Sequence, residues 1–367
     1  MELRPAEVRH FALDGVPVAV VPERGGHINR SFRVRCTSPG GERQYLVQRL
    51  NPRVFADGER VMANVSAVTA HVHASAPARR THLPQQHELV LVPTRAGAPW
   101  FTASDGAIWR AFPWLAGTPA CGRATTPVTA HATGRAFGTF LQLLSDYAGP
   151  PLACTIPHFH DTARYFERLE SAVAGDVAGR ASRVVGELER CRRHRAVVDE
   201  LPSAGQEGVP VRVIHNDAKA ANVLLDARDR PLAVVDLDTV MPGSALSDVG
   251  DLLRSLASPT AEDEPDLSTV RAEPALVLAA LAGWFAGAGT ALSERERASA
   301  VLAGCVITLE QAVRFLTDYL TGDIYYAATD PEQNLRRTRT QLQLFDSLLV
   351  QRRELERAAH HLPTEVD

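Results

Sequence analysis

The chain has 367 residues, which is long enough for two lobes that each bury a core of their own. Its composition, 45% hydrophobic and 22% charged, is ordinary for a soluble globular enzyme, and a formal net charge of -4 argues against a general nucleic-acid-binding surface. Because the N-terminus lacks a sustained apolar core and no window approaches the ~20 apolar residues of a membrane span, we expect a cytoplasmic protein without a membrane segment. A monomer or weak homodimer is a separate expectation.

The first 115 residues are predicted to form mostly sheet. Short apolar runs, several of them alternating with polar residues, predict its strands at residues 16–21, 32–34, 44–50, 88–93 and 107–114. One helix is expected over residues 57–72. A Pro- and Gly-containing stretch at residues 115–119 is the predicted hinge between an N-terminal nucleotide-binding lobe (residues 1–115) and a C-terminal catalytic and substrate-binding lobe (residues 116–367).

The second lobe is predicted to be mainly helical. Apolar residues at helical spacing predict helices at residues 128–147, 161–174, 181–200, 274–286, 294–320 and 331–360. A short β segment at residues 211–238 interrupts them. The pattern predicts an α+β fold with two lobes, the first small and rich in strands and the second larger and mainly helical.

The interrupting β segment carries polar side chains at the edges of its apolar runs. Asp217 follows the first run, Asn222 comes five residues later, and Asp236 ends the last run. Each alone would more often shape a turn, but together they match a magnesium-dependent phosphoryl transferase, which needs a carboxylate at the acceptor hydroxyl and further oxygen ligands on the metal. We predict Asp217 as the catalytic base and Asn222 and Asp236 as Mg²⁺ ligands. His215 is expected to be a packed histidine that braces the loop.

Several residues are candidates for holding a nucleotide. The turn at Gly25 and Gly26, which continues through Asn29 and Ser31, would lay backbone N–H groups over phosphates, although an ordinary hairpin turn remains the alternative. Arg49, in an early strand, is the candidate cation for the α- and β-phosphates.

Gln48, next to Arg49, is the alternative for the position that contacts the phosphates. Gln48 faces the opposite side of the strand, and kinases usually place a lysine at this point. Lys219 is the only lysine of the chain and lies in the catalytic loop. It either contacts the leaving phosphate or is solvated, and both interpretations stay open.

The His-x-Asp-x-x-x-x-Asn loop with a following Asp resembles the aminoglycoside phosphotransferase and choline kinase superfamily. A closer resemblance, to its N-acetylhexosamine 1-kinase branch, lies in short motifs at residues 26–32, 48–51, 109–110, 134–138, 155–162, 235–243, 247–254, 314–323, 334–335 and 339–341. The resemblance covers most of the chain. It implies a bilobal protein-kinase-like fold and ATP-dependent phosphorylation of an anomeric hydroxyl.

The same resemblance implies roles for individual residues. Backbone groups of Ala111 and Phe112 would bind adenine. Arg314 and Asp318 lie four residues apart on one helix and so share a face, where they either form a surface ion pair or, as the family pattern implies, reach into a sugar pocket. The residues placed at the substrate are Arg314, Asp318, His160 and Asp238, of which Asp238 alternatively flanks the metal site.

The predicted protein is therefore an ATP- and Mg²⁺-dependent sugar 1-kinase whose partners are a nucleoside triphosphate and a small sugar-like acceptor. One alternative is a kinase for another acceptor, such as an aminoglycoside, a different sugar or a small alcohol. The densest acidic run, at residues 262–266, contains a proline and no apolar periodicity, which favours an exposed loop over the acidic pocket wall that an aminoglycoside needs. A catalytically silent, kinase-like binding protein is the second alternative.

Overall fold

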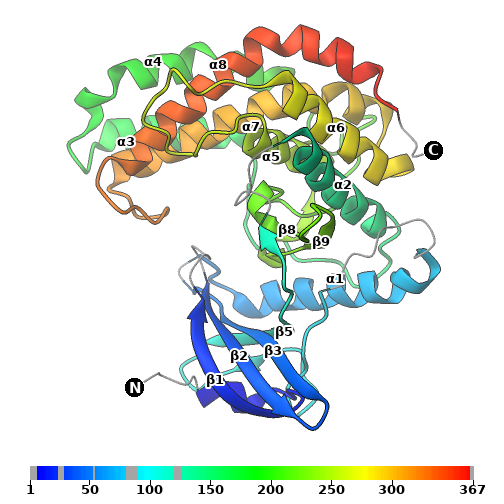
Figure 1. The fold of residues 1–367 in the computed structure, drawn as a ribbon. Helices are drawn as coiled ribbons and strands as arrows, with labels where there is room; N and C mark the ends of the chain where they lie inside the picture. The colour runs from blue at the N-terminus through cyan, green and yellow to red at the C-terminus, as the bar shows by residue number, and fades with distance from the viewer. Residues whose placement is uncertain (1–5, 24–28, 53, 80–88, 120–125, 364–367) are drawn as a thin grey trace. The chain divides into compact units, whose positions relative to one another are not determined.

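A computed structural model of the chain describes residues 6–23, 29–52, 54–79, 89–119 and 126–363 (Figure 1). The chain divides into two compact units, which we describe separately. The first unit consists of Met1–Gly117, Tyr147–Ile156 and Val235–Met241. The second consists of Thr118–Asp146, Pro157–Val234 and Pro242–Asp367.

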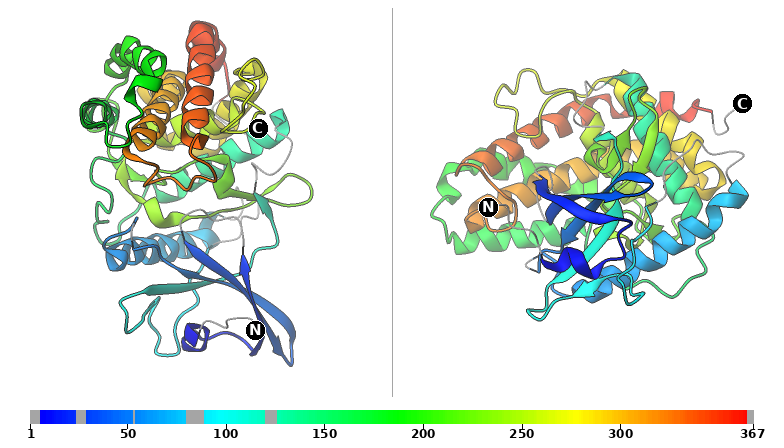
Figure 2. Two further views of the ribbon diagram at one scale, coloured as in Figure 1. Left: turned by 90° about the vertical axis from the view of Figure 1, so that its left-hand side faces the viewer. Right: turned by 60° about the horizontal axis from the view of Figure 1, so that its bottom comes forward.

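The first unit is built on a five-stranded antiparallel sheet. Its strands follow the order β1 (Val16–Glu23), β2 (Arg30–Ser38), β3 (Gly41–Arg49), β5 (Ile108–Pro113) and β4 (Phe101–Thr102). The twist of the three long strands is plain in Figure 2. One face carries the alternating apolar residues of the core, among them Val34, Val47 and Ala111, which are fully buried.

One predicted strand of this unit is absent from the described part of residues 88–93. Residues 89–93 are irregular, and Val92 makes a single backbone bond there, from its N–H to the carbonyl of Ala111 at 2.8 Å. Pro93 offers no N–H to extend the pairing.

The helix of this unit, α1 (Gly58–Arg79), runs across one end of the sheet (Figure 1) and fastens two later segments of the chain. The side-chain amide of Asn64, which is 3% exposed, donates to the carbonyls of Ala153 and Val240 at 2.8 and 2.9 Å and accepts from the N–H of Ala153 at 2.9 Å. Because the buried amide is paired on both sides, residues 147–156 and 235–241 are held within the first unit. The second of these includes the 3₁₀ turn η6 (Leu237–Thr239).

Short strands of the second unit flank the predicted catalytic loop. β6 (Thr118–Pro119), β8 (Val223–Leu225) and β9 (Pro231–Val234) form one antiparallel sheet. β7 (Arg212–Ile214) pairs with β10 (Met241–Gly243), the strand at which the chain passes from the first unit back into the second. The loop between β7 and β8 contains one 3₁₀ turn, η5 (Ala220–Asn222).

Helices make up the rest of the second unit. They are α2 (Pro127–Leu144), α3 (Thr162–Gly175), α4 (Val185–Arg193), α5 (Ala245–Leu256), α6 (Pro274–Ala288), α7 (Glu294–Thr321) and α8 (Gln333–His360), with 3₁₀ turns η3 (Ala181–Arg183), η4 (Arg195–Glu200) and η7 (Gly289–Ala291). The helix predicted over residues 181–200 is wrong, since η3, α4 and η4 divide that segment. α5 was not predicted, although its buried Leu246, Val249 and Leu253 lie at helical spacing.

Helices α2 and α6 meet through glycines. A Cβ atom built at Gly134 of α2 would lie 2.1 Å from the carbonyl oxygen of Ala280, and one at Gly283 of α6 would lie 2.0 Å from that of His131. Gly138 and Gly287 continue the contact one turn further along each helix. Only residues without side chains allow the two backbones to approach so closely.

Helix α7 forms the centre of this unit. Figure 1 shows it, in orange, alongside α8, in red. By length and composition, α7 and the stretch Pro274–Ala291 would suffice to cross a membrane, but 89% of the α7 window and 44% of the other are buried within the structure. Burial of α7 on nearly all sides accounts for its apolar composition, as in the core helix of a globular protein.

Candidate active site

The loop after β7 brings Asp217 and Asn222 together, as the sequence spacing predicts. The side-chain amide of Asn222 donates to both the carbonyl oxygen and the Oδ2 atom of Asp217, each at 2.8 Å. Because both bonds use the amide nitrogen, the Oδ1 atom of Asn222 takes no part in them. Lys219 completes the group: its Nζ lies 2.7 Å from Asp217 Oδ2.

These contacts set the ionisation of Asp217. Burial alone would raise the pKa of its carboxyl group, but the charge and hydrogen bond of Lys219 outweigh burial and lower the pKa to about 2. The side chain is 24% exposed, so it is still open to a ligand. At neutral pH Asp217 is therefore an ionised acceptor of hydrogen bonds.

Asp248 anchors the loop from α5. Its carboxylate, only 2% exposed, accepts the backbone N–H groups of His215 and Asn216 at 2.8 and 2.7 Å. Burial raises the pKa of Asp248 to about 6, although His215 and the two N–H groups act against burial. The His215 ring is fully buried and packs edge-on against Phe137 and Phe140, in agreement with the packed role predicted for it.

Three residues at or beside predicted site positions have left-handed backbone conformations. The φ angles are 64° at Asn216, 63° at Asp236 and 59° at His160. Non-glycine residues adopt this conformation at a cost, and they cluster at functional sites when the surroundings hold them there.

The first unit contains Asp236 and a buried ion pair two residues beyond it. Asp236 is partly buried and precedes η6. Asp238, on η6, is 3% exposed and pairs with the guanidinium of Arg110, which is 2% exposed. Asn29 donates from Nδ2 to the second carboxylate oxygen of Asp238 at 2.6 Å. The charges of Arg110 and Asp238 therefore compensate each other away from water.

A row of polar side chains continues from Arg110 across the sheet. Gln48 accepts from Arg110 Nε at 3.0 Å and donates to the hydroxyl of Ser31, also at 3.0 Å. The three residues are register partners on β2, β3 and β5, so their side chains share one face of the sheet. Ser31, Asn29 and Asp238 were predicted site residues and Gln48 was the alternative to Arg49, whereas no role was predicted for Arg110. An arginine between Trp109 and Ala111 in an apolar strand was the signal for Arg110.

The remaining nucleotide-site candidates lie elsewhere in the first unit. Arg49 points to the face opposite Gln48, where Nη2 lies 3.1 Å from the Asp105 carboxylate. Ala111 is fully buried, and Phe112 is 5% exposed with the Arg110 guanidinium 5.3 Å from its ring centre. Their roles at phosphate and adenine stay predictions. Gly25 and Gly26 lie outside the described residues.

Two predicted substrate residues are engaged inside the second unit. Asp318, 5% exposed, accepts backbone N–H groups at 2.8–3.0 Å and the Asn334 amide at 3.0 Å. These N–H donors belong to Ile324, Tyr325 and Tyr326. Asp318 therefore shapes the turn after α7.

The Arg314 guanidinium lies among aromatic rings. Its distances to the ring centres are 5.2, 5.0 and 5.8 Å for Phe159, Tyr165 and Tyr326 respectively. It is 12% exposed and lies 3.7 Å from Glu310. Arg314 and Asp318 therefore each have other partners: Arg314 is stabilised by these rings and by Glu310, and Asp318 by the turn after α7.

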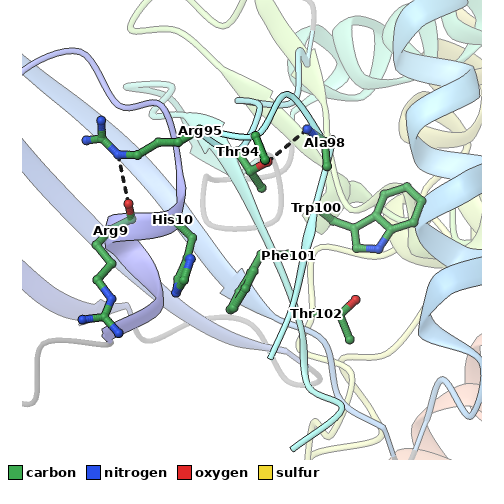
Figure 3. Close-up of a pocket in the computed structure, with 9 residues that line it drawn as sticks. Arg9, His10, Thr94, Arg95, Ala98, Trp100, Phe101 and Thr102 are labelled. Atoms are coloured by element: carbon green, nitrogen blue, oxygen red, sulfur yellow. Dashed lines mark hydrogen bonds between the residues drawn. The ribbon is translucent and has the colours of Figure 1, made fainter. Parts of the chain in front are cut away.

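A cavity of about 340 Å³ lies elsewhere in the first unit (Figure 3). His10 and Phe101 stack within it at 3.8 Å between ring centres, and the Nε atom of Arg95 donates to the carbonyl of Arg9 at 3.0 Å. None of the predicted site residues lines this cavity.

The part of the chain that the structure describes contains no cluster of three His, Cys, Asp or Glu side chains suited to a metal. The predicted Mg²⁺ ligands are an amide and a carboxylate, Asn222 in the second unit and Asp236 in the first. Both are hard oxygen donors, which fits Mg²⁺ and the additional water and phosphate oxygens that it takes. Their joint role as ligands stays a prediction.

Much of the chain matches a known protein family. The model of the phosphotransferase enzyme family matches residues 20–284, more than half of the chain. The chain belongs to this family. Three solved structures in its fold class are similar to this phosphotransferase.

The aminoglycoside phosphotransferase from Alicyclobacillus acidocaldarius subsp. acidocaldarius DSM 446 has a TM-score of 0.60 at 15% identity, covering 99% of this chain and 98% of that chain. A microcompartment-associated aminopropanol kinase has a TM-score of 0.60 at 15% identity, covering 97% and 98%. The AMP-bound complex of a spectinomycin phosphotransferase has a TM-score of 0.51 at 10% identity, covering 98% and 94%. The predicted bilobal α+β, kinase-like fold is confirmed.

Proposed function

We propose that this phosphotransferase is an ATP- and Mg²⁺-dependent kinase that phosphorylates the anomeric C1 hydroxyl of an N-acetylhexosamine or a related sugar. The observation that carries the kinase assignment is the loop geometry: an ionised, partly exposed Asp217 is hydrogen-bonded to Asn222, and Asp248 anchors the loop behind them. The choice of sugar rests on the resemblance of the surrounding motifs to sugar 1-kinases. The AMP bound by the similar spectinomycin phosphotransferase supports a nucleotide co-substrate.

Asp217 orients the acceptor in this proposal. Its carboxylate accepts a hydrogen bond from the attacking hydroxyl and receives the proton late, since a group with a pKa of about 2 is a weak base. Phosphoryl transfer through a loose transition state requires little early proton removal, so positioning and charge stabilisation supply most of the acceleration. Bound Mg²⁺, held by Asn222 and Asp236, would neutralise charge on the transferring phosphate. Lys219 lies at the same carboxylate and is available for the leaving phosphate.

The charges of the second unit support a neutral acceptor over a polycationic aminoglycoside. A polycation needs available carboxylates, yet Asp318 is engaged by backbone N–H groups and by Asn334. Two carboxylates of the acidic run at residues 262–266 are engaged as well: Glu262 lies 2.8 Å from Arg254, and Asp263 accepts from Gln333 at 2.8 Å. We further propose that the enzyme acts in the cytoplasm on soluble substrates, as a monomer or weak homodimer.

An acceptor panel tests this function. ATP consumption is measured with N-acetylhexosamines, other free sugars, aminoglycosides and small amino alcohols, and ³¹P–¹³C coupling then locates the phosphate on the product. We expect the best turnover with an N-acetylhexosamine and a phosphate on C1. Asp217→Asn should lower kcat about 10²–10⁴-fold, whereas Asp199→Asn, at a carboxylate that is 72% exposed, should leave kcat unchanged. Preferred turnover of an aminoglycoside or amino alcohol would refute the sugar assignment, and nucleotide binding without turnover of any acceptor would refute the kinase assignment.

A further inference from the structure

His160 sits between α7 and the catalytic loop with both ring nitrogens engaged. Nδ1 lies 2.9 Å from Glu310 Oε1, and Nε2 lies 2.9 Å from the backbone carbonyl oxygen of Asn216. The side chain is only 6% exposed. A sugar hydroxyl would have to break one of these bonds to reach the ring, so the geometry disfavours the substrate contact predicted for His160.

Glu310 is the centre of this buried cluster. It is 1% exposed, and besides His160 it accepts from the hydroxyl of Thr162 at 2.7 Å and lies 3.7 Å from the Arg314 guanidinium. A buried carboxylate is stable only when it is paired and hydrogen-bonded in this way.

The partners of His160 determine its charge. A backbone carbonyl only accepts, so Nε2 carries a proton, and an ionised Glu310 requires a second proton on Nδ1. Burial lowers the pKa of His160, but the charge and hydrogen bond of Glu310 outweigh burial and raise it, while Arg314 acts in the opposite direction. The Asp248 carboxylate also interacts electrostatically with His160. The ring is therefore a charged donor to the Asn216 carbonyl.

That carbonyl belongs to the peptide group that leads into Asp217. The N–H of Asn216 is held by Asp248 at 2.7 Å, and the C=O of Asn216 is held by His160. Two partners on two different elements thus fix both sides of a residue whose φ is 64°. Because the peptide plane of this carbonyl also contains the N and Cα atoms of Asp217, fixing the carbonyl fixes the N–Cα bond from which the Asp217 side chain is placed.

We propose that His160, held by Glu310, is a positioning residue that aims Asp217 by clamping the Asn216 carbonyl. The inference uses the proposed function only for the role of Asp217. Charge-assisted hydrogen bonds are the stronger class in proteins, and a misplacement of about 1 Å at a reacting group costs on the order of 10²-fold in rate. One bond of this kind is therefore sufficient to affect turnover without contact with the substrate.

Two conservative substitutions separate the two ring nitrogens. His160→Gln keeps an N–H donor near the position of Nε2, whereas His160→Asn keeps one near Nδ1 and leaves the Asn216 carbonyl without its partner. The matched control is His158→Asn. His158 also has a left-handed φ, 61°, but its side chain is 49% exposed and contacts Asp161 and Arg164 rather than the loop.

We expect His160→Asn to lower kcat about 10–100-fold with little change in either KM, and His160→Gln to recover most of that loss. His158→Asn should match the wild type. An increase in the acceptor KM at unchanged kcat would instead place His160 at the substrate. Equal kcat values for the Asn and Gln variants would leave only a space-filling role, and either result would overturn the proposal.

Hydrogen–deuterium exchange of the full chain provides a readout that does not depend on turnover. Backbone amides of residues 215–222 should exchange faster in His160→Asn than in the wild type, and His160→Gln should restore their protection. Unchanged exchange in this loop would overturn the proposal. If the wild type phosphorylates none of the acceptors, the proposed function fails, but the exchange measurement still decides whether His160 clamps the loop.

Discussion

The contact between Lys219 and Asp217 should dominate the ionisation of the proposed base. The pKa of Asp217, lowered from 3.8 to about 2, corresponds to about 2 kcal/mol in favour of the ionised form. Both side chains keep contact with water, with 33% of Lys219 and 24% of Asp217 exposed, so we discount this to about 1 kcal/mol. Because Lys219 acts against burial, the coupling energy between the two residues in the enzyme without substrates should be at least this large.

A double-mutant cycle measures this coupling. Free energies of unfolding in urea are determined at pH 7 for the wild type, Lys219→Gln, Asp217→Asn and the double variant. In the wild type, the lowered pKa of Asp217 contributes stability above pH 3.8 that is lost as the pH falls towards 2. Asp217→Asn should therefore destabilise the wild type at pH 7.

The same substitution should behave differently once Lys219 is replaced. Burial, the largest single influence on the pKa of Asp217, is then opposed only by His215 and Asn222, so the pKa rises and the ionised carboxylate contributes less stability at pH 7. Asp217→Asn should therefore cost less stability in this background than in the wild type. The control is the exposed pair Arg195 and Asp199, at 2.9 Å, whose coupling should stay below about 0.5 kcal/mol. An identical cost of Asp217→Asn in both backgrounds would refute the electrostatic argument.

Three further substitutions test the packing and the buried charges by urea or thermal unfolding. Gly134→Ala should destabilise the protein by about 1–3 kcal/mol, because its Cβ would lie 2.1 Å from a backbone carbonyl oxygen. The control Gly186→Ala, on α4 with no atom within 4 Å of the added Cβ, should be neutral or stabilising. Equal effects of the two substitutions would contradict the close contact between α2 and α6. Arg110→Met should cost about 3–5 kcal/mol by leaving Asp238 unpaired, and adding Asp238→Asn should recover part of this loss; strictly additive losses would show that the pair is not coupled. Asp318→Asn should cost about 1–3 kcal/mol, since an amide cannot accept every bond that the carboxylate accepts, and an unchanged unfolding temperature would argue against the turn-anchoring role.

The fold class and the contact between Asp217 and Asn222 were predictable because their signals are local. Asp217 and Asn222 are five residues apart, so one short loop brings them together. The alternation of the early strands and the helical spacing later in the chain likewise depend on neighbouring residues. The segments at residues 147–156 and 235–241 give no such signal. They are held in the first unit by bonds to residues far away in the sequence, among them those of the Asn64 side chain to Ala153 and Val240.

The polar network that joins Ser31, Gln48 and Arg110 was not predictable, for a different reason. Alternation says that Arg49 and Gln48 face opposite sides of β3, but both sides of this sheet carry apolar residues, so the pattern does not say which side joins a polar network. Pairing of Gln48 with Ser31 on one neighbouring strand and Arg110 on the other is a matter of register. Register follows from the assembled sheet and is not contained in any one strand.

Some of the buried charge in the second unit lies around the loop that contains Asp217. Asp248 and the pair of His160 with Glu310 act on opposite sides of Asn216, one on its N–H and one on its C=O. Apolar residues of similar volume would often give an equally stable core, because burying charge is costly. They could not select the left-handed conformation of Asn216, which requires directional bonds to both of its peptide groups. Burial of the Asp248 carboxylate, which raises its pKa to about 6, reflects this cost. In return, the proposed clamp on Asn216 holds Asp217 in one direction.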